Sequence, residues 1–148
     1  MAAEHPKQCH FQSDKLILSL DLNLKAKVKE IRPVIDHIME KIKEMGCATG
    51  KEFEVETSIH EAVVNAVVHG CKLDPGCSVQ VSVVCDKEQG MLVVVRDPGD
   101  GFNPDDIPSP IEAEQLFEEH GRGIYLINQL MDEVRIEKGG TEIWMHKK

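Results

Sequence analysis

Apolar positions along the chain follow two periods, one typical of helices and one typical of strands. They recur every three or four residues over about residues 24–45 and 51–68, which predicts two amphipathic helices. A shorter segment with the same period, residues 123–131, predicts a third helix. Alternating or valine-rich runs predict strands at residues 15–22, 78–85, 91–96, 133–137 and 141–145.

The order of these elements indicates the fold class. Strands 78–85 and 91–96 are separated by the short segment 86–90, and the last two strands by a Gly139-Gly140 turn, so both pairs are expected to be hairpins. Hairpins that alternate with helices predict an α+β fold. We expect a two-layer sandwich in which helices cover one face of a mostly antiparallel mixed sheet.

Proline and glycine mark the boundaries of the predicted helices. Pro33 lacks the N–H of an interior helical bond, so the first helix is expected to kink there or to begin only just before it. Gly46 suits the left-handed residue that ends a helix, and the second helix is expected to stop at Gly70. The polar residues 1–14 are interpreted as a flexible N-terminal arm, which leaves residues 15–148 as one domain.

Composition and charge narrow the functions open to such a domain. The chain has 148 residues, of which 41% are hydrophobic and 29% charged, a globular mixture that can bury one core. Its 26 acidic residues outnumber its 17 basic ones, and the net charge of −9 argues against nucleic acid or an anionic membrane as a partner. The longest wholly apolar run, residues 91–95, is too short to span a bilayer, and the first residues lack a signal-peptide pattern. We therefore expect a cytoplasmic protein with small ligands and protein partners.

The five cysteines are expected to be reduced. They include no C-x-x-C pair and their number is odd, so they are interpreted as small buried hydrophobic residues of a cytoplasmic protein. His69, Cys71 and Cys77 are near one another in sequence, but their spacing fits no standard zinc pattern. No zinc site is expected there.

A polar stripe on the second predicted helix is a candidate functional site. Glu61, Asn65 and His69 are spaced by four residues, and each step of four rotates by about 40° around a helix, so the three share one face among alanines and valines. A solvent-facing edge is the alternative interpretation, although Lys, Arg and Gln would be expected beside Glu there, and asparagine is a poor helix former. We expect Asn65 to be exposed on this stripe.

Two glycine-containing segments are further candidates. In the first, a buried strand runs directly into Asp97, Gly99 and Gly101, where glycine allows a ligand to approach the backbone closely. In the second, Gly121-Arg122-Gly123 opens a helix, whose free N–H groups suit a phosphate. Taken alone, the first segment could be an ordinary tight turn and the second an ordinary flexible helix start.

Together, in this order and at these separations, the three segments resemble the N, G1 and G2 boxes of the GHKL superfamily of ATP-binding domains, which includes gyrase and the histidine kinases. The segment Gly121 to Ile127, with Leu130 to Val134 after it, is similar to the bacterial anti-sigma factors that are also serine-protein kinases (RsbW-like). The resemblance covers about residues 15–146. It implies the Bergerat-type ATP-binding fold.

The resemblance implies a role for each matching residue. Asn65 would bind Mg²⁺, and Glu61 would be the general base that accepts a proton from an attacking serine hydroxyl. Asp97 would accept a hydrogen bond from the adenine amino group of ATP, supported by Thr141. The other implied nucleotide-binding residues are Gly99 and Gly101 beside the base, and Gly121, Arg122 and Gly123 around the phosphates.

The function implied by the resemblance is that of an ATP-dependent protein serine kinase and anti-sigma factor. It would phosphorylate an anti-sigma-factor antagonist and sequester a sigma factor, usually as a homodimer. The alternative is a nucleotide-gated partner-binding module of the same fold, in which Glu61 would be dispensable. Residues 102–120 would form a lid over the ATP, since prolines deny regular structure to residues 98–110. His69 would either contact the nucleotide or cap the helix end.

Overall fold

The computed structural model describes residues 15–99 and 119–148, so the predicted arm and nearly all of the predicted lid lie outside the described residues. The described elements are β1 (Leu18–Lys25), α1 (Val28–Met45), α2 (Glu52–Val64) continued by the π-helix η3 (Asn65–Gly70), β2 (Ser78–Asp86), β3 (Gly90–Arg96), α4 (Glu119–Leu130), β4 (Glu133–Glu137), the 3₁₀ turn η5 (Lys138–Gly140) and β5 (Glu142–Lys147).

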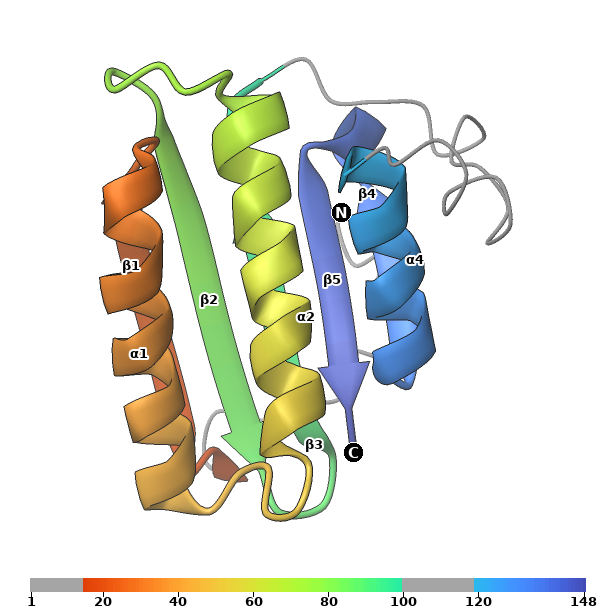
Figure 1. Ribbon diagram of the computed structural model, residues 1–148. Coiled ribbons are helices and arrows are strands. Elements are labelled where there is room, and N and C mark those ends of the chain that lie inside the picture. Colours follow the sequence, from red (N-terminus) through yellow and green to blue (C-terminus); the bar gives the residue numbers. More distant parts are fainter. Residues whose placement is uncertain (1–14, 100–118) are drawn as a thin grey trace.

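The strands form one sheet in the order β1-β2-β3-β5-β4, and every pair of neighbours is antiparallel. Figure 1 shows α1, α2 and α4 lying side by side on one face of this sheet. The prediction of a two-layer α+β sandwich covered by helices on one face is therefore confirmed.

The core lies between the sheet and the helices. On β2 and β3 every second residue faces the helices and is at most 2% exposed, as the strand period requires. From α1, the fully buried Ile35, Ile38 and Ile42 recur at three and four residues and meet this valine surface. Among the described residues no helix is long and apolar enough to cross a membrane.

β1 and α1 both begin a few residues later than the sequence predicted. The alternation of β1 continues through Leu22 and Leu24, which pair with Val81 and Val79 of β2. The strand follows its partner to the beginning of β2, so it ends at residue 25 rather than 22. The helix consequently starts at Val28 instead of residue 24.

Gly46 ends the first helix as predicted, but the helix begins at Val28, five residues before Pro33 and not just before it. Pro33 lies in the first part of α1, where its missing N–H costs one helical hydrogen bond, to the carbonyl of Lys29. Gly46 has a φ of 69°, and its N–H approaches the carbonyls of Ile42 and Lys43, which ends the helix.

Two cysteines are bonded, which corrects the expectation that all five are reduced. Cys71 and Cys77 form a disulfide with their Cα atoms 5.7 Å apart, across the loop between η3 and β2. The loop turns back on itself because Asp74 N–H donates to the Cys71 carbonyl and Cys77 N–H donates to the Asp74 carbonyl. A separation of six residues is not a recognised sequence pattern, so this turn was not evident from spacing. Cys47 and Cys85 are free.

Gly50 and Gly90 both have a positive φ but differ in the space around them, so substitutions at the two positions distinguish the effect of steric overlap from that of backbone strain. Gly90 at the start of β3 has a φ of 88°, and a Cβ there would lie 2.4 Å from the carbonyl oxygen of Lys147. Gly50 has a φ of 82°, and no described atom lies within 4 Å of its added Cβ. Gly50→Ala should lower the free energy of unfolding by about 1 kcal/mol through strain alone. Gly90→Ala should lower it by at least about 2 kcal/mol.

Urea unfolding of the two variants measures this difference. If the free energy of unfolding falls equally in the two variants, β5 can move away from β3, and the inference that Gly90 is tightly packed is wrong.

Candidate functional site

The polar stripe of the second helix lies where α2 and η3 contact α4. Asn65 is only 5% exposed, contrary to the expectation of an exposed amide, whereas the Glu61 side chain is 28% exposed. A Cβ added at Gly123 of α4 would lie 2.8 Å from Glu61 Oε1 and 3.5 Å from Asn65 Nδ2. Glycine at this position therefore preserves the space between α4 and the two polar side chains.

The helix widens where the stripe passes from α2 into η3. From Asn65 onward its hydrogen bonds close wider turns, and the N–H of Cys71 donates to the carbonyl of Ala66 at 2.8 Å. The sequence predicted a regular α-helix to residue 68, so the π-helical turn is a difference from that prediction. Within this turn Asn65 is buried and His69 is exposed.

The end of η3 packs against the turn that follows β3. A Cβ added at Gly70 would lie 2.4 Å from Cγ of Asp97, and one added at Gly99 would lie 2.1 Å from the carbonyl oxygen of Gly70. A larger residue at either position would displace backbone or the Asp97 carboxylate. The two glycines therefore set the distance between the helix end and the sheet.

The Asp97 carboxylate is held inside this turn. Its Oδ1 accepts a hydrogen bond from the N–H of Gly99 at 2.8 Å, and its own N–H donates to the carbonyl of Thr141 at 3.0 Å. Burial raises the pKa of Asp97 above its ordinary 3.8, and the hydrogen bond from Gly99 opposes that rise only in part. A desolvated carboxylate of this kind is stabilised by a further hydrogen-bond donor.

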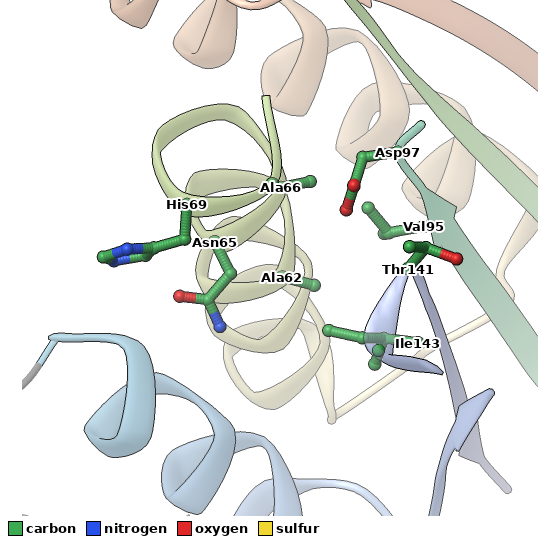
Figure 2. Close-up of a pocket in the computed structure, with 10 residues that line it drawn as sticks. Ala62, Asn65, Ala66, His69, Val95, Asp97, Thr141 and Ile143 are labelled. Carbon is green, nitrogen blue, oxygen red and sulfur yellow. The ribbon is translucent and has the colours of Figure 1, made fainter. Parts of the chain in front are cut away.

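A pocket lies between the helix and the sheet. Figure 2 shows Ala62 and Ala66 pointing from the helix toward Asp97 and Thr141, with Asn65 on an adjoining side of the same helix. The two alanines are four residues apart on one helix face, and their short side chains leave the space open. The pocket is lined by Ala62, Asn65, Ala66, His69, Gly70, Val95, Asp97, Gly140, Thr141 and Ile143.

An ion pair on the other face of the sheet holds the strand ends that form the pocket wall. Arg96 Nε donates to Glu142 Oε2 at 3.0 Å, and Trp144 Nε1 donates to Oε1 of the same carboxylate at 3.0 Å. The guanidinium also lies 5.9 Å from the centre of the Trp144 ring. Arg96 precedes Asp97 and Glu142 follows Thr141, so this cluster fixes β3 against β5 at the pocket.

The polar groups fit a nucleotide and its metal ion. Asn65 Nδ2 is buried and has no hydrogen-bond partner among the described residues. Rotation of the amide exchanges its nitrogen and oxygen, so the side chain can offer an oxygen to a hard cation. The described residues contain no cluster of three His, Cys, Asp or Glu side chains suited to a metal. A magnesium ion here would therefore depend on phosphate oxygens and water for most of its ligands.

The first turn of α4 supplies groups for an anion. The helix begins at Glu119, so the segment Gly121-Arg122-Gly123 lies at its N-terminal end. The helix thus begins two residues before Gly121 instead of at the glycine pair, so only its first N–H groups, up to about Gly121, lack a helical partner, while the N–H of Gly123 can bond to the carbonyl of Glu119; the helix dipole is positive at this end. Because Gly123 adjoins Glu61 and Asn65, an anion at this end would lie near both side chains.

The structure brings most of the predicted site residues together. The group on the helix side consists of Glu61, Asn65 and Gly123. The group on the sheet side consists of Asp97, Gly99 and Thr141. Gly121 and Arg122 lie in α4, and Gly101 lies outside the described residues.

Sequence reasoning missed the small and apolar residues that shape the pocket. Ala62 and Ala66 carry a signal that could have been used, because two small residues four apart share a helix face beside the stripe. Gly70 was interpreted only as the end of a helix. Its contact with Asp97 joins segments far apart in the chain, and sequence periodicity does not report such contacts.

Comparison with known proteins finds one matching family and several relatives that share a name. The family model described as histidine kinase-like ATPase domain matches residues 24–147. The Anti-sigma F factor of Geobacillus thermodenitrificans is 36% identical over 100 residues, which cover 64% of this chain and 67% of that protein. The proteins of the same name from Geobacillus stearothermophilus and Bacillus cytotoxicus are 37% identical over 105 residues and 35% identical over 99 residues, with the same shares of each chain.

The raised pKa of Asp97 predicts an effect on stability. An ionised carboxylate that is desolvated by folding lowers the free energy of unfolding at pH values above its folded-state pKa, and this penalty disappears below the ordinary pKa of 3.8. Asp97→Asn can keep the hydrogen bond from Gly99 without the charge. The variant should therefore be at least as stable as the parent at pH 7, and the difference should vanish near pH 3.

Asp74 provides a matched control for this measurement. Its Oδ1 accepts a hydrogen bond from Gly76 N–H at 2.9 Å in the same local geometry, but Asp74 is exposed. Urea unfolding across pH 3–7 should show the pH-dependent difference for Asp97→Asn and not for Asp74→Asn. A clear loss of stability in Asp97→Asn at pH 7 would contradict the desolvation of this carboxylate.

Proposed function

This chain belongs to the family of histidine kinase-like ATPase domains, and from that premise we propose that its pocket binds ATP and that the protein is an anti-sigma regulatory factor with protein serine kinase activity. The observation that carries the proposal is that one pocket holds both the buried Asn65, whose Nδ2 has no partner among the described residues, and the desolvated Asp97. Without a ligand, burial of each group lowers the free energy of unfolding, and Mg-ATP would supply a partner for each of them.

The sheet side of the pocket would hold the base. Asp97 accepts the hydrogen bond of the adenine amino group, which restores a donor to its desolvated carboxylate. The flat adenine ring would lie between the helix face of Ala62 and Ala66 and the side chain of Ile143, because the short alanine side chains leave space beside the helix. Thr141, whose carbonyl holds the Asp97 N–H, completes the wall.

The helix side would hold the phosphates and the metal ion. Asn65 would offer its amide oxygen to Mg²⁺, and the free N–H groups at the start of α4, near Gly121, would bind phosphate oxygens, with Gly123 leaving room for them beside Glu61 and Asn65. Bound Mg-ATP supplies the phosphoryl group for transfer.

Glu61 would be the general base. Its side chain is 28% exposed, so the hydroxyl of a docked partner can reach it, and the missing Cβ of Gly123 keeps Oε1 uncovered on the side of α4. It would accept the proton of a serine hydroxyl as the serine oxygen attacks the phosphoryl group supplied by ATP. His60 Nδ1 lies 3.7 Å from the other carboxylate oxygen of Glu61, Oε2.

The partners follow from the relatives. Their name, Anti-sigma F factor, refers to a sigma factor, and we extend that partner to this chain. An anti-sigma-factor antagonist would carry the serine that is phosphorylated, and the protein would act as a homodimer in the cytoplasm. The net charge of −9 is compatible with protein partners and unfavourable for nucleic acid.

Replacement of the base tests the kinase activity. Glu61→Gln keeps the size of the side chain and removes its basicity, so it should retain nucleotide affinity while phosphoryl transfer to a cognate antagonist falls by about 10²–10⁴-fold. Transfer is measured with labelled ATP and detected as phosphoserine. Glu56→Gln is the matched control, because Glu56 lies on the same helix, pairs with Arg32 and does not line the pocket.

Two outcomes would count against phosphotransfer. No label on serine in the parent protein, with a validated partner, would exclude the kinase activity. An unchanged partner response in Glu61→Gln would favour a nucleotide-gated binding module that does not transfer phosphate.

Replacement of the metal ligand tests the site itself. Asn65→Ala removes a buried polar group without a described partner and introduces a better helix former, so the free energy of unfolding should be unchanged or higher. Magnesium-dependent binding of ATP, measured by calorimetry, should be lost. Ser58→Ala is the control, because Ser58 is also buried in α2 without a described partner but does not line the pocket. A large fall in melting temperature in Asn65→Ala without ATP would instead make Asn65 a structural residue.

A further inference from the structure

The Cys71–Cys77 disulfide lies beside the pocket. Cys71 directly follows Gly70, whose backbone packs against the Asp97 carboxylate. At the other end of the loop, the carbonyl of Cys77 accepts a hydrogen bond of 3.0 Å from the N–H of Ala26, next to β1. The disulfide therefore ties the end of the helix that carries the site to the sheet.

The loop closed by this disulfide has a backbone that ordinary residues avoid. Lys72 and Leu73 have φ angles of 54° and 59°, in the left-handed region. The N–H of Leu73 donates to the carbonyl of Val67 at 3.0 Å, which continues the wide turns of η3 beyond Gly70. Loop and helix end thus form one continuous piece of structure, so a change in the loop reaches Gly70.

The disulfide can be reached from one side. Cys77 is half-buried, whereas Cys71 is 5% exposed, so an attacking thiolate would reach the sulfur of Cys77. The other two described cysteines are poor reaction partners. Burial raises the pKa of Cys47 and of Cys85, which keeps both as thiols.

We propose that Cys71 and Cys77 form a reversible redox site, with a dithiol as its reductant, that controls nucleotide affinity through the position of Gly70. The proposal takes its ligand and its reducing compartment from the proposed function, but the exchange between the two cysteines can be measured without nucleotide. A disulfide in a reducing compartment is usually transient and catalytic or redox-sensing. Because this disulfide lies beside the pocket, its opening would directly affect the pocket wall at Gly70.

The reaction is a thiol–disulfide exchange. A thiolate of the dithiol attacks Cys77 Sγ, the bond between the two cysteines breaks, and Cys71 leaves as a thiolate and takes up a proton. The second thiol of the reductant then attacks the mixed disulfide and releases Cys77. The protein gains two electrons and two protons, and the dithiol becomes a disulfide.

Reduction removes the cross-link that holds the loop closed. Lys72 and Leu73 can then return to common backbone angles, and Gly70 is released from its contact with Asp97. The oxidised form has the pocket preorganised, so it should bind nucleotide more tightly. We expect reduction to weaken binding by about fivefold or more, the usual scale of coupling between sites.

The test compares the full-length protein before and after dithiothreitol. Alkylation and mass spectrometry should show residues 71–77 labelled only after reduction, and hydrogen exchange of residues 66–73 should be faster in the reduced form. The dissociation constant of a fluorescent ATP analogue should rise on reduction. The double variant Cys71→Ser with Cys77→Ser should resemble the reduced protein under both conditions, and Cys47→Ser should respond like the parent.

The readouts separate the two proposals. Equal nucleotide affinity and equal exchange in both redox states would overturn the redox site, as would alkylation of both cysteines without reductant. If neither form binds nucleotide but exchange at residues 66–73 still changes on reduction, the ATP-binding function is wrong and redox control of the helix end is supported. A change in affinity that persists in the double variant would assign the effect to another thiol and overturn the proposal.

Discussion

The close approach of two backbones at Gly70 is the constraint on which the site depends. The helix end and the turn after β3 meet where a Cβ on Gly70 or Gly99 would overlap the other segment. This contact fixes the position of Asp97 relative to Asn65, which lies one turn earlier on the helix. The pocket exists because the segments touch at this point while the helix face of Ala62 and its neighbours leaves space beside it.

The two walls of the pocket are held in different ways. The sheet wall is part of a continuous antiparallel ladder from β2 through β3 to β5, and the Arg96–Glu142 pair reinforces it at the pocket. The helix wall ends in a π-helical turn and is held beyond Gly70 by backbone hydrogen bonds of the loop and by the Cys71–Cys77 disulfide. The disulfide is a bond that can open by itself, whereas the hydrogen bonds of a central strand open together, so we expect the helix wall to respond to regulation more readily than the sheet wall.

Much of the fold followed from periodicity, and most of the remainder depended on contacts between distant segments. The helices, hairpins and α+β layers were predicted because each element buries one regular apolar face. The site residues were found by their chemistry and by resemblance, and the structure brings Glu61, Asn65 and Gly123 into contact. The burial of Asn65, the π-helical turn and the Cys71–Cys77 disulfide were not predicted. Each arises from packing or from a turn that changes the distance between residues without changing their spacing in sequence.

The site residues share one property that separates them from the core. Asn65 buries an amide without a described partner, Asp97 carries a desolvated charge, and Gly123 places the poorest ordinary helix former inside α4. The buried amide and the desolvated charge each destabilise the folded chain, and Gly123 is required only because Glu61 and Asn65 occupy the space beside it. The three residues line or adjoin a single pocket. One ligand with an amino group, a cation and phosphate oxygens would offset their free-energy cost together. Residues that served only the fold would not be expected to gather in one pocket in this way, and this clustering is the physical support for the proposed nucleotide site.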